Sequence, residues 1–364
     1  MKKGRAAGII LLVAVIVAAV LIASLTGQSD LLRLPKKTVT VSGYVGGEKI
    51  GFLADEQVQK ILRDRYGIEV DYTKAGSIEM VSDYDLTHVD FLFPSSQTAY
   101  EIFKQAHGGQ SGKSEKVFFS PIVLYSWNEV AEALEKNGLC QRQAGGYYTA
   151  DLGKLVEQVL AGAKWKDFGL DIYGNFKIIS TDPNKSNSGT MYAALLANIL
   201  SGNDVAGETD IPRVSAEVSR VFGLLGQMES SSGTLFTRYL NLGMGESPIV
   251  VGYENQIIEF AESDPALWEK VRGQVALIYP EPTVWSEHYL IALTDNGRKL
   301  LDALADEDIM RIAWEKHGFR TGNSIYSMDE ADLQALGICR TITQVVPVPD
   351  ADSMLRLLKM IASN

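Results

Sequence analysis

The sequence has few of the residues that build disulfide frameworks, zinc sites or common catalytic centres. Its 364 residues include two cysteines and four histidines. Cys140 and Cys339 have no CxxC spacing, so they predict neither a disulfide framework nor a structural zinc site; they could form one disulfide or remain two buried thiols. The histidines are far apart in sequence, and no HExxH or GxSxG motif occurs. We therefore expect no catalytic residues, no metal and no cofactor, and a hydrolase assembled only in the folded chain is a lesser alternative.

Positive charge is also scarce. The chain has 34 Lys and Arg residues against 45 Asp and Glu residues, a net charge of −11, which excludes the basic surface that nucleic-acid binding needs. A segment ending in Gly112, Lys113 and Ser114 resembles the end of a phosphate-binding loop, but His107 stands where the first glycine belongs and a strand pattern follows it. The overall composition, 46% hydrophobic and 22% charged, is that of a globular protein of about two domains.

The N-terminus carries the one long hydrophobic run. Lys2, Lys3 and Arg5 precede residues 6–25, which contain no charge and no proline. Twenty residues at a helical rise of ~1.5 Å span the ~30 Å hydrocarbon core of a membrane, so we expect a transmembrane helix within residues 1–27. The basic flank predicts that everything after it lies outside the cytoplasm. A cleaved signal segment is the alternative, which would leave the protein periplasmic or secreted; no cysteine directly follows the run, which excludes a lipoprotein anchor.

The rest of the chain alternates between strand and helix patterns. After a polar linker at residues 28–37, β-branched and apolar runs at residues 38–45, 68–72, 89–93 and 117–127 predict strands, and helix-spaced apolar residues fall between them. A second set of strands and helices follows, with strands expected at residues 176–181, 248–253 and 275–279. This rhythm predicts an α/β fold of two lobes. We expect residues 38–123 and 284–364 to form a discontinuous first lobe and residues 124–283 to form the second.

Three segments give the pattern a family resemblance. Residues 179–190 (ISTDPNKSNSGT) open a helix, residues 279–293 (YPEPTVWSEHYLIAL) return the chain to the first lobe, and a late helix closes with Gly318, Phe319 and Arg320. Together with the order of elements, they resemble the type 2 periplasmic solute-binding proteins from residue 38 to residue 364, most closely the branch that binds oxyanions and iron. The resemblance implies a hinge and a ligand cleft between the lobes.

Serine-rich segments provide the candidate ligand contacts. Ser186, Ser188, Gly189 and Thr190 lie where a helix begins, and the free N–H groups and dipole of a helix N-terminus favour an anion. Ordinary helix capping is the alternative for these residues. In the first lobe, Ser95 and Ser96 follow a strand and precede a helix, which repeats the arrangement with the same alternative.

Two tyrosines complete the expected site. Tyr44 lies at the carboxyl end of the first strand, the edge at which open α/β sheets bind ligands. Tyr253 ends a strand of the second lobe, where its hydroxyl could donate to an oxyanion, ligate ferric iron as a phenolate, or simply pack beneath a helix. The neighbouring Glu254 conflicts with the anion interpretation, because a carboxylate would oppose an anion.

These observations predict an extracytoplasmic solute-binding protein. A small solute, expected to be an anion, would bridge the lobes and shift the population toward a closed form. As the resemblance implies, the closed form would be presented to an ABC-type importer in the membrane. A membrane-anchored sensor or scaffold with the same fold is the alternative.

Overall fold

The computed structural model describes residues 38–108, 112–202, 204–322 and 327–362. The expected transmembrane segment (residues 1–27) and linker (residues 28–37) lie outside these residues. Within the described ranges, no helix is both long and apolar enough to cross a membrane.

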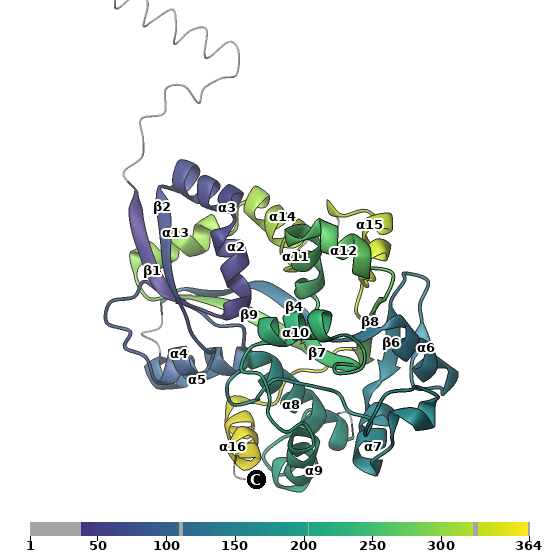
Figure 1. Ribbon diagram of the computed structural model, residues 1–364. Helices are drawn as coiled ribbons and strands as arrows, with labels where there is room; N and C mark the ends of the chain where they lie inside the picture. Colours follow the sequence, from purple (N-terminus) through teal and green to yellow (C-terminus); the bar gives the residue numbers. More distant parts are fainter. Residues whose placement is uncertain (1–37, 109–111, 203, 323–326, 363–364) are drawn as a thin grey trace, which may run out of the picture.

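Nine strands form one mixed sheet, in the order β2-β1-β3-β9-β4-β8-β6-β5, with β7 paired to β4 (Figure 1). β2, β1 and β3 run parallel, whereas β9 and β4 pair antiparallel. The strands are β1 (Val39–Val45), β2 (Ile68–Lys74), β3 (Phe91–Phe93), β4 (Ser114–Trp127), β5 (Gln141–Arg142), β6 (Tyr148–Asp151), β7 (Ile249–Tyr253), β8 (Val275–Glu281) and β9 (Trp285–Ala292).

The long strand β4 joins the two parts of the sheet. Its residues 114–121 pair with β9, and its residues 122–127 pair with β7 and β8. The crossing therefore lies at Pro121 and Ile122, and the chain returns between β8 and β9. We call the part built around β1, β2, β3 and β9 the first lobe, and the part built around β5, β6, β7 and β8 the second lobe.

Helices cover both faces of the sheet in the first lobe. Alternate side chains of β1 point to opposite faces, so Val41 and Val45 pack in one apolar core while Tyr44 packs against another. The helices on the first core are α2 (Ile50–Ala54), α3 (Glu56–Ile61), α13 (Asp295–Ala303) and α14 (Glu307–Glu315); those on the other are α4 (Glu79–Ser82) and α5 (Gln97–His107).

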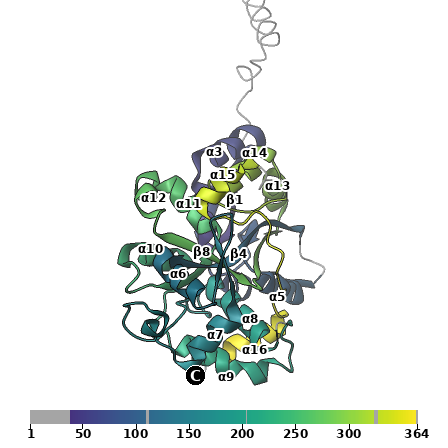
Figure 2. The same ribbon diagram turned by 90° about the vertical axis from the view of Figure 1, so that its right-hand side faces the viewer.

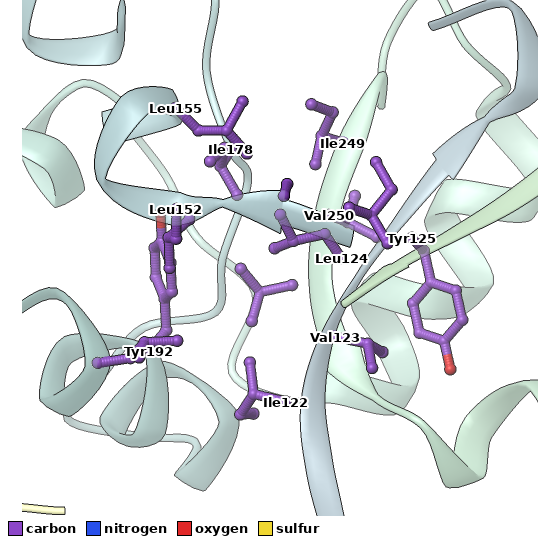
Figure 3. Close-up of a cluster of buried hydrophobic side chains, with 14 of the residues drawn as sticks. Ile122, Val123, Leu124, Tyr125, Leu152, Leu155, Ile178, Tyr192, Ile249 and Val250 are labelled. Carbon is purple, nitrogen blue, oxygen red and sulfur yellow. The ribbon is translucent and has the colours of Figure 1, made fainter. Parts of the chain in front are cut away.

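The second lobe is built around helix α8 (Asn187–Leu200). Its residues from Ser188 to Asn198 are all buried, which explains why the helix is apolar on every side. Figure 3 shows part of the apolar core of this lobe, to which β4 contributes Ile122 and Leu124 and α8 contributes Tyr192. The surrounding helices are α6 (Asn128–Lys136), α7 (Leu152–Ala161), α9 (Ile211–Gly223), α10 (Ser232–Leu242), α11 (Asn255–Ser263) and α12 (Pro265–Val271).

The C-terminal segment departs from the expected division of the chain. Residues 284–364 were expected in the first lobe, but α16 (Ala351–Ala362) packs on α9 and α8, side by side with them in Figures 1 and 2. Met354, Leu357 and Ile361 recur at helical spacing and join the core of the second lobe. α15 (Glu330–Leu336) also contributes there, through Leu333.

The two cysteines do not bond to each other. Cys140 and Cys339 are free, buried thiols that donate to the carbonyl oxygens of Ala131 and Thr341, both at 3.1 Å. The alternative of two buried thiols is therefore the one found in the structure.

The strand expected at residues 176–181 is reduced to a single bridge between Ile179 and Val250, so that this segment reaches the N-terminus of α8 as a loop.

Candidate functional site

A polar cleft of about 430 Å³ lies between the lobes. Its first-lobe wall comes from the loops after β1 and β2, and its second-lobe wall comes from the segments that begin α8 and α10. The lining residues are Gly46, Gly47, Glu48, Lys74, Ala75, Gly76, Ser77, Glu79 and Tyr84 of the first lobe, and Lys185, Ser186, Asn187, Ser230, Ser231, Ser232, Gly233, Gln256 and Glu259 of the second. An adjoining hollow of about 370 Å³ continues along residues 183–187 to α16.

Two helix N-termini open into this cleft. Ser186 is the N-cap of α8 and Ser231 is the N-cap of α10, and neither side chain makes a capping hydrogen bond. The first-turn N–H groups of a helix have no partner within the helix, so both ends offer donors and positive potential to the cleft. In contrast, Ser96 caps α5 in the ordinary way, because its Oγ accepts from Ala99 N at 3.3 Å.

The predicted residues at the start of α8 have different surroundings. Ser186 lines the cleft and Thr190 lines the adjoining hollow. Ser188 is only 1% exposed, and its Oγ lies 2.8 Å from Thr181 Oγ1. Thr190 Oγ1 donates to Pro183 O at 2.8 Å. Gly189 lies against the same loop, since an added Cβ would be 2.5 Å from Thr181 O. These three residues hold residues 181–186 against the helix.

The predicted residues of the first lobe lie close to the second. Ser95 is fully buried, and its carbonyl oxygen accepts from Asn187 Nδ2 at 2.6 Å and from Ser286 Oγ at 2.7 Å. The Asn187 bond joins the two lobes at the base of the cleft. Tyr44 is half-buried and packs edge-on against Tyr84, a residue of the cleft wall, with ring centroids 4.9 Å apart. The structure thus places Tyr44 behind the wall.

Tyr253 belongs to the same junction. It is 1% exposed, and its hydroxyl accepts from Asn187 Nδ2 at 3.0 Å. Burial, together with the charge of Glu48, raises the pKa of Tyr253 well above its usual value, so the phenol stays protonated. These surroundings suit a buried hydrogen-bonding residue better than a phenolate ligand. Within the described residues, no group of three or more His, Cys, Asp or Glu side chains could hold a metal ion.

The conflict expected from Glu254 is removed by its partners. Its carboxylate is fully buried and accepts from Arg320 Nε at 2.6 Å, from a second Arg320 nitrogen at 2.7 Å and from Tyr279 at 2.5 Å. A buried carboxylate bound in this way is compensated. Glu254 therefore joins the lobes at the crossing, where Arg320 compensates its charge.

Known proteins resemble this chain in structure but not in sequence. No family model matches the sequence, and no curated protein matches it. Solved structures do match. A substrate-binding protein of an ABC transporter from Agrobacterium tumefaciens is 14% identical, with 90% of this chain and 94% of that chain covered and a TM-score of 0.56. Apo ferric ion-binding protein A from Pasteurella haemolytica is 13% identical over 89% and 95%, with a TM-score of 0.54. The sulfate-binding protein SubI from Mycobacterium tuberculosis H37Rv is 13% identical over 87% and 96%, with a TM-score of 0.52.

The chain has the fold of a type 2 periplasmic solute-binding protein. The expected resemblance is thereby confirmed at the level of the fold. The cleft described above lies between the two lobes of this fold, and its walls include strand ends and helix starts.

Several residues of the cleft were not anticipated from the sequence. A clear signal existed for α10, because residues 232–234 repeat the Ser-Gly-Thr of residues 188–190 at a helix start. By sequence alone, residues 230–234 are equally typical of a solvated turn, but residues 230–233 line the cleft. No sequence pattern marks Lys74 or Glu48, whose position depends on how β1 and β2 pair.

A buried polar group lies beneath the first-lobe wall. Lys49 is fully buried and donates to Glu48 Oε1 at 2.5 Å and to Ser95 Oγ, and its Nζ is 3.3 Å from His288 Nδ1. Burial lowers the pKa of Lys49, although Glu48 acts in the opposite direction. Burial and Lys49 together hold the pKa of His288 well below its usual value. Neutral His288 can therefore accept a hydrogen bond from the ammonium group of Lys49. The charge of Lys49 in turn compensates Glu48 from behind the cleft.

Proposed function

We propose that this protein is an extracytoplasmic solute-binding protein that captures a small anionic solute between its two lobes and presents it to an ABC-type importer. The N-terminal segment would hold it at the outer face of the membrane. The observation that carries the anion assignment is the pair of helix N-termini, α8 and α10, whose capping serines leave their first-turn N–H groups free toward one cleft.

Cationic side chains support the same assignment. Lys74, at the end of β2, enters the cleft from the first lobe, and Lys185 enters from the second. Lys185 Nζ lies 3.4 Å from Asp182 Oδ2. Lys74, in contrast, has no carboxylate within ion-pair distance among the described residues. An anion between the helix starts and Lys74 would contact both lobes, and such a solute favours the closed form.

The glutamates of the cleft do not oppose this assignment, because two of them have a basic partner. Glu48 is paired with Lys49, and Glu259 lies 3.2 Å from His317 Nδ1. The third, Glu79, accepts from Gly76 N at 3.2 Å. Each of these three carboxylates therefore has an ion-pair or hydrogen-bond partner within the protein.

The assignment is tested by placing a negative charge where the solute's charge would lie. Ser186→Glu suits the start of a helix, so folding should be preserved. The repulsion and the lost hydrogen bonds should weaken binding of the copurified solute by at least ~10-fold. The solute is identified by mass spectrometry and its affinity measured by calorimetry.

Ala266→Glu is the matched control, because it adds the same charge to the first turn of α12, away from the cleft. Its affinity should equal that of the wild type. Equal affinity in Ser186→Glu as well, with that variant folded, would contradict the anion site.

The membrane assignment has its own test. Because Lys2, Lys3 and Arg5 flank the apolar run on its N-terminal side, protease added to intact spheroplasts should digest the lobes. N-terminal analysis of the mature protein distinguishes an uncleaved anchor from a cleaved signal. Full protection of the lobes would contradict the proposed location.

A further inference from the structure

The cleft contains hydrogen-bond acceptors as well as donors. Glu48, Glu79 and Glu259 all line it. Each carboxylate uses one of its oxygens within the protein, Oε1 in Glu48 and Glu259 and Oε2 in Glu79. The second oxygen of each has no hydrogen-bond or ion-pair partner among the described residues. An ionised carboxylate only accepts hydrogen bonds, so these three oxygens can bind only donor groups of a solute. Sulfate has no such donor.

The three carboxylates do not converge on one point. Glu48 comes from the turn after β1, Glu79 from α4 and Glu259 from α11. Within the part of the chain that the structure describes, they form no group that could hold a metal ion. One small cationic centre therefore cannot use all three, whereas hydroxyl groups spread along a carbon chain can each donate to a different carboxylate.

Two buried serine hydroxyls line the same space. Ser232 is only 9% exposed and lines the cleft, and its Oγ has no hydrogen-bond partner among the described residues. Ser77, which is 6% exposed, accepts from Ser95 N at 3.0 Å, and no described residue accepts the proton of its own hydroxyl. A buried polar group without a partner is costly, so both hydroxyls favour a solute that pairs with them. Since a hydroxyl both donates and accepts, either serine can bind a solute hydroxyl.

The size and one wall of the cleft also suit an organic solute. Its volume of about 430 Å³ lies in the range of ~300–1,000 Å³ that is usual for sites of organic ligands, and the adjoining hollow shares Glu79 and Lys185 with it. Tyr84, 38% exposed, adds an aromatic ring to the wall, with Tyr44 packed edge-on against it. The face of an aromatic ring carries partial negative charge, so it disfavours an anion but packs well against C–H groups.

We propose that the solute is a hydroxylated organic anion. Its anionic group lies between the helix starts and Lys74, its hydroxyls donate to the free oxygens of the three cleft carboxylates, and its carbon chain lies against Tyr84. This inference rests on the proposed function, because it names the class of solute for the same cleft. A bare oxyanion is disfavoured, since it would leave the carboxylate oxygens without donors as the cleft loses water.

Matched probes test the class of solute. Calorimetry on the full-length chain, dialysed free of copurified solute, compares phosphates that share a three-carbon chain: glycerol 3-phosphate has hydroxyls, propyl phosphate has none and 3-aminopropyl phosphate has an ammonium group. Glycerate, propionate and 3-aminopropionate repeat the comparison for a carboxylate, and sulfate represents a bare oxyanion. In the series that binds, the hydroxylated member should bind at least ~10-fold more tightly than either of the others and than sulfate.

The other results separate this inference from the proposed function. Equal binding within each series would overturn the inference and leave the anion site in place. The same holds if sulfate, an unsubstituted member or an ammonium-bearing member binds most tightly. If none of these anions binds, the proposed function is contradicted together with the inference.

Glu79→Gln tests the contact with the carboxylates directly. Glu79 is exposed, so the substitution should preserve folding, but it weakens a charge-assisted hydrogen bond from a solute hydroxyl. The affinity ratio of the hydroxylated to the unsubstituted probe should fall at least ~3-fold; this ratio cancels the repulsion that Glu79 exerts on any anion. Glu69→Gln, the same change at an exposed residue of β2 outside the cleft, is the matched control and should keep the wild-type ratio. A wild-type ratio in Glu79→Gln as well would overturn the proposed contact.

Discussion

The buried ion pair between Arg320 and Glu254 joins two residues that are distant in sequence. Arg320 and Glu254 are 66 residues apart and meet where β4 crosses between the lobes. Burial alone would lower the pKa of Arg320, but the charge of Glu254 and its hydrogen bonds to Arg320 outweigh burial and raise this pKa above its usual value. Such pairs specify how the lobes join, because neither charge is satisfied alone.

Removing one member of this pair should be costly. Arg320→Leu leaves the Glu254 carboxylate buried with Tyr279 as its remaining side-chain donor, so we expect the free energy of unfolding to fall by about 3–5 kcal/mol. Arg311→Ala breaks an exposed pair with Glu315 and should cost less than about 1 kcal/mol. Urea denaturation measures both, and equal losses would show that the buried pair has no special role.

His288 should make stability depend on pH. Its folded pKa is depressed, first by burial and then by Lys49, so the unfolded chain binds the proton more readily. The stabilising contribution is complete above the unfolded histidine pKa of about 6.5 and is lost as the pH falls below it. Urea denaturation at about pH 7.5 and pH 5.5 should show a larger loss for the wild type than for His288→Gln. The same loss in both would exclude His288 as the cause.

At the level of elements, helix α8 forms both the core of the second lobe and part of the cleft wall. Its N-terminal residues press against the loop of residues 181–186, and its remaining turns are buried among α7, α9 and α16. The loop therefore cannot move without disturbing the helix. This packing fixes the direction in which the free N–H groups point.

Gly189 should report this packing. Gly189→Ala places a Cβ 2.5 Å from Thr181 O, so the loop or the helix must shift, and we expect a loss of about 1–3 kcal/mol. Gly223→Ala in α9 meets nothing within 4 Å and should be neutral or stabilising by up to about 1 kcal/mol, since alanine favours helix more than glycine does. Thermal and urea denaturation compare the two. A neutral Gly189→Ala would mean that the contact is not tight.

The sequence predicts elements better than contacts. β-branched runs located β1 and β4, and the Ser-Gly-Thr before an apolar run located the start of α8, because these signals are local. The cleft position of Ser186 and the burial of Ser188, two residues later, depend on how the chain turns into the helix. The pairing of Glu254 with Arg320 and the packing of α16 on α9 depend on tertiary structure, which no short pattern contains.

At the scale of the whole molecule, polar contacts join the lobes at several places. The base of the cleft has Asn187 on Ser95, the crossing has Glu254 on Arg320, and the cleft side has Glu259 on His317. In addition, Ala351 N at the start of α16 donates to Glu101 of α5 at 3.1 Å, so the C-terminal helix also touches both lobes. Lobe movement must therefore break specific polar contacts.

The central claim is that an anion lies between the starts of α8 and α10 and the end of β2. A crystal structure of the protein with the solute that copurifies with it tests this claim most directly. The account predicts density for an anionic group in contact with first-turn backbone N–H groups of α8 (residues 187–189) or α10 (residues 232–234), and with Lys74 from the opposite lobe. A solute bound elsewhere, or a cation held by Glu48 and Glu259 in this cleft, would contradict it.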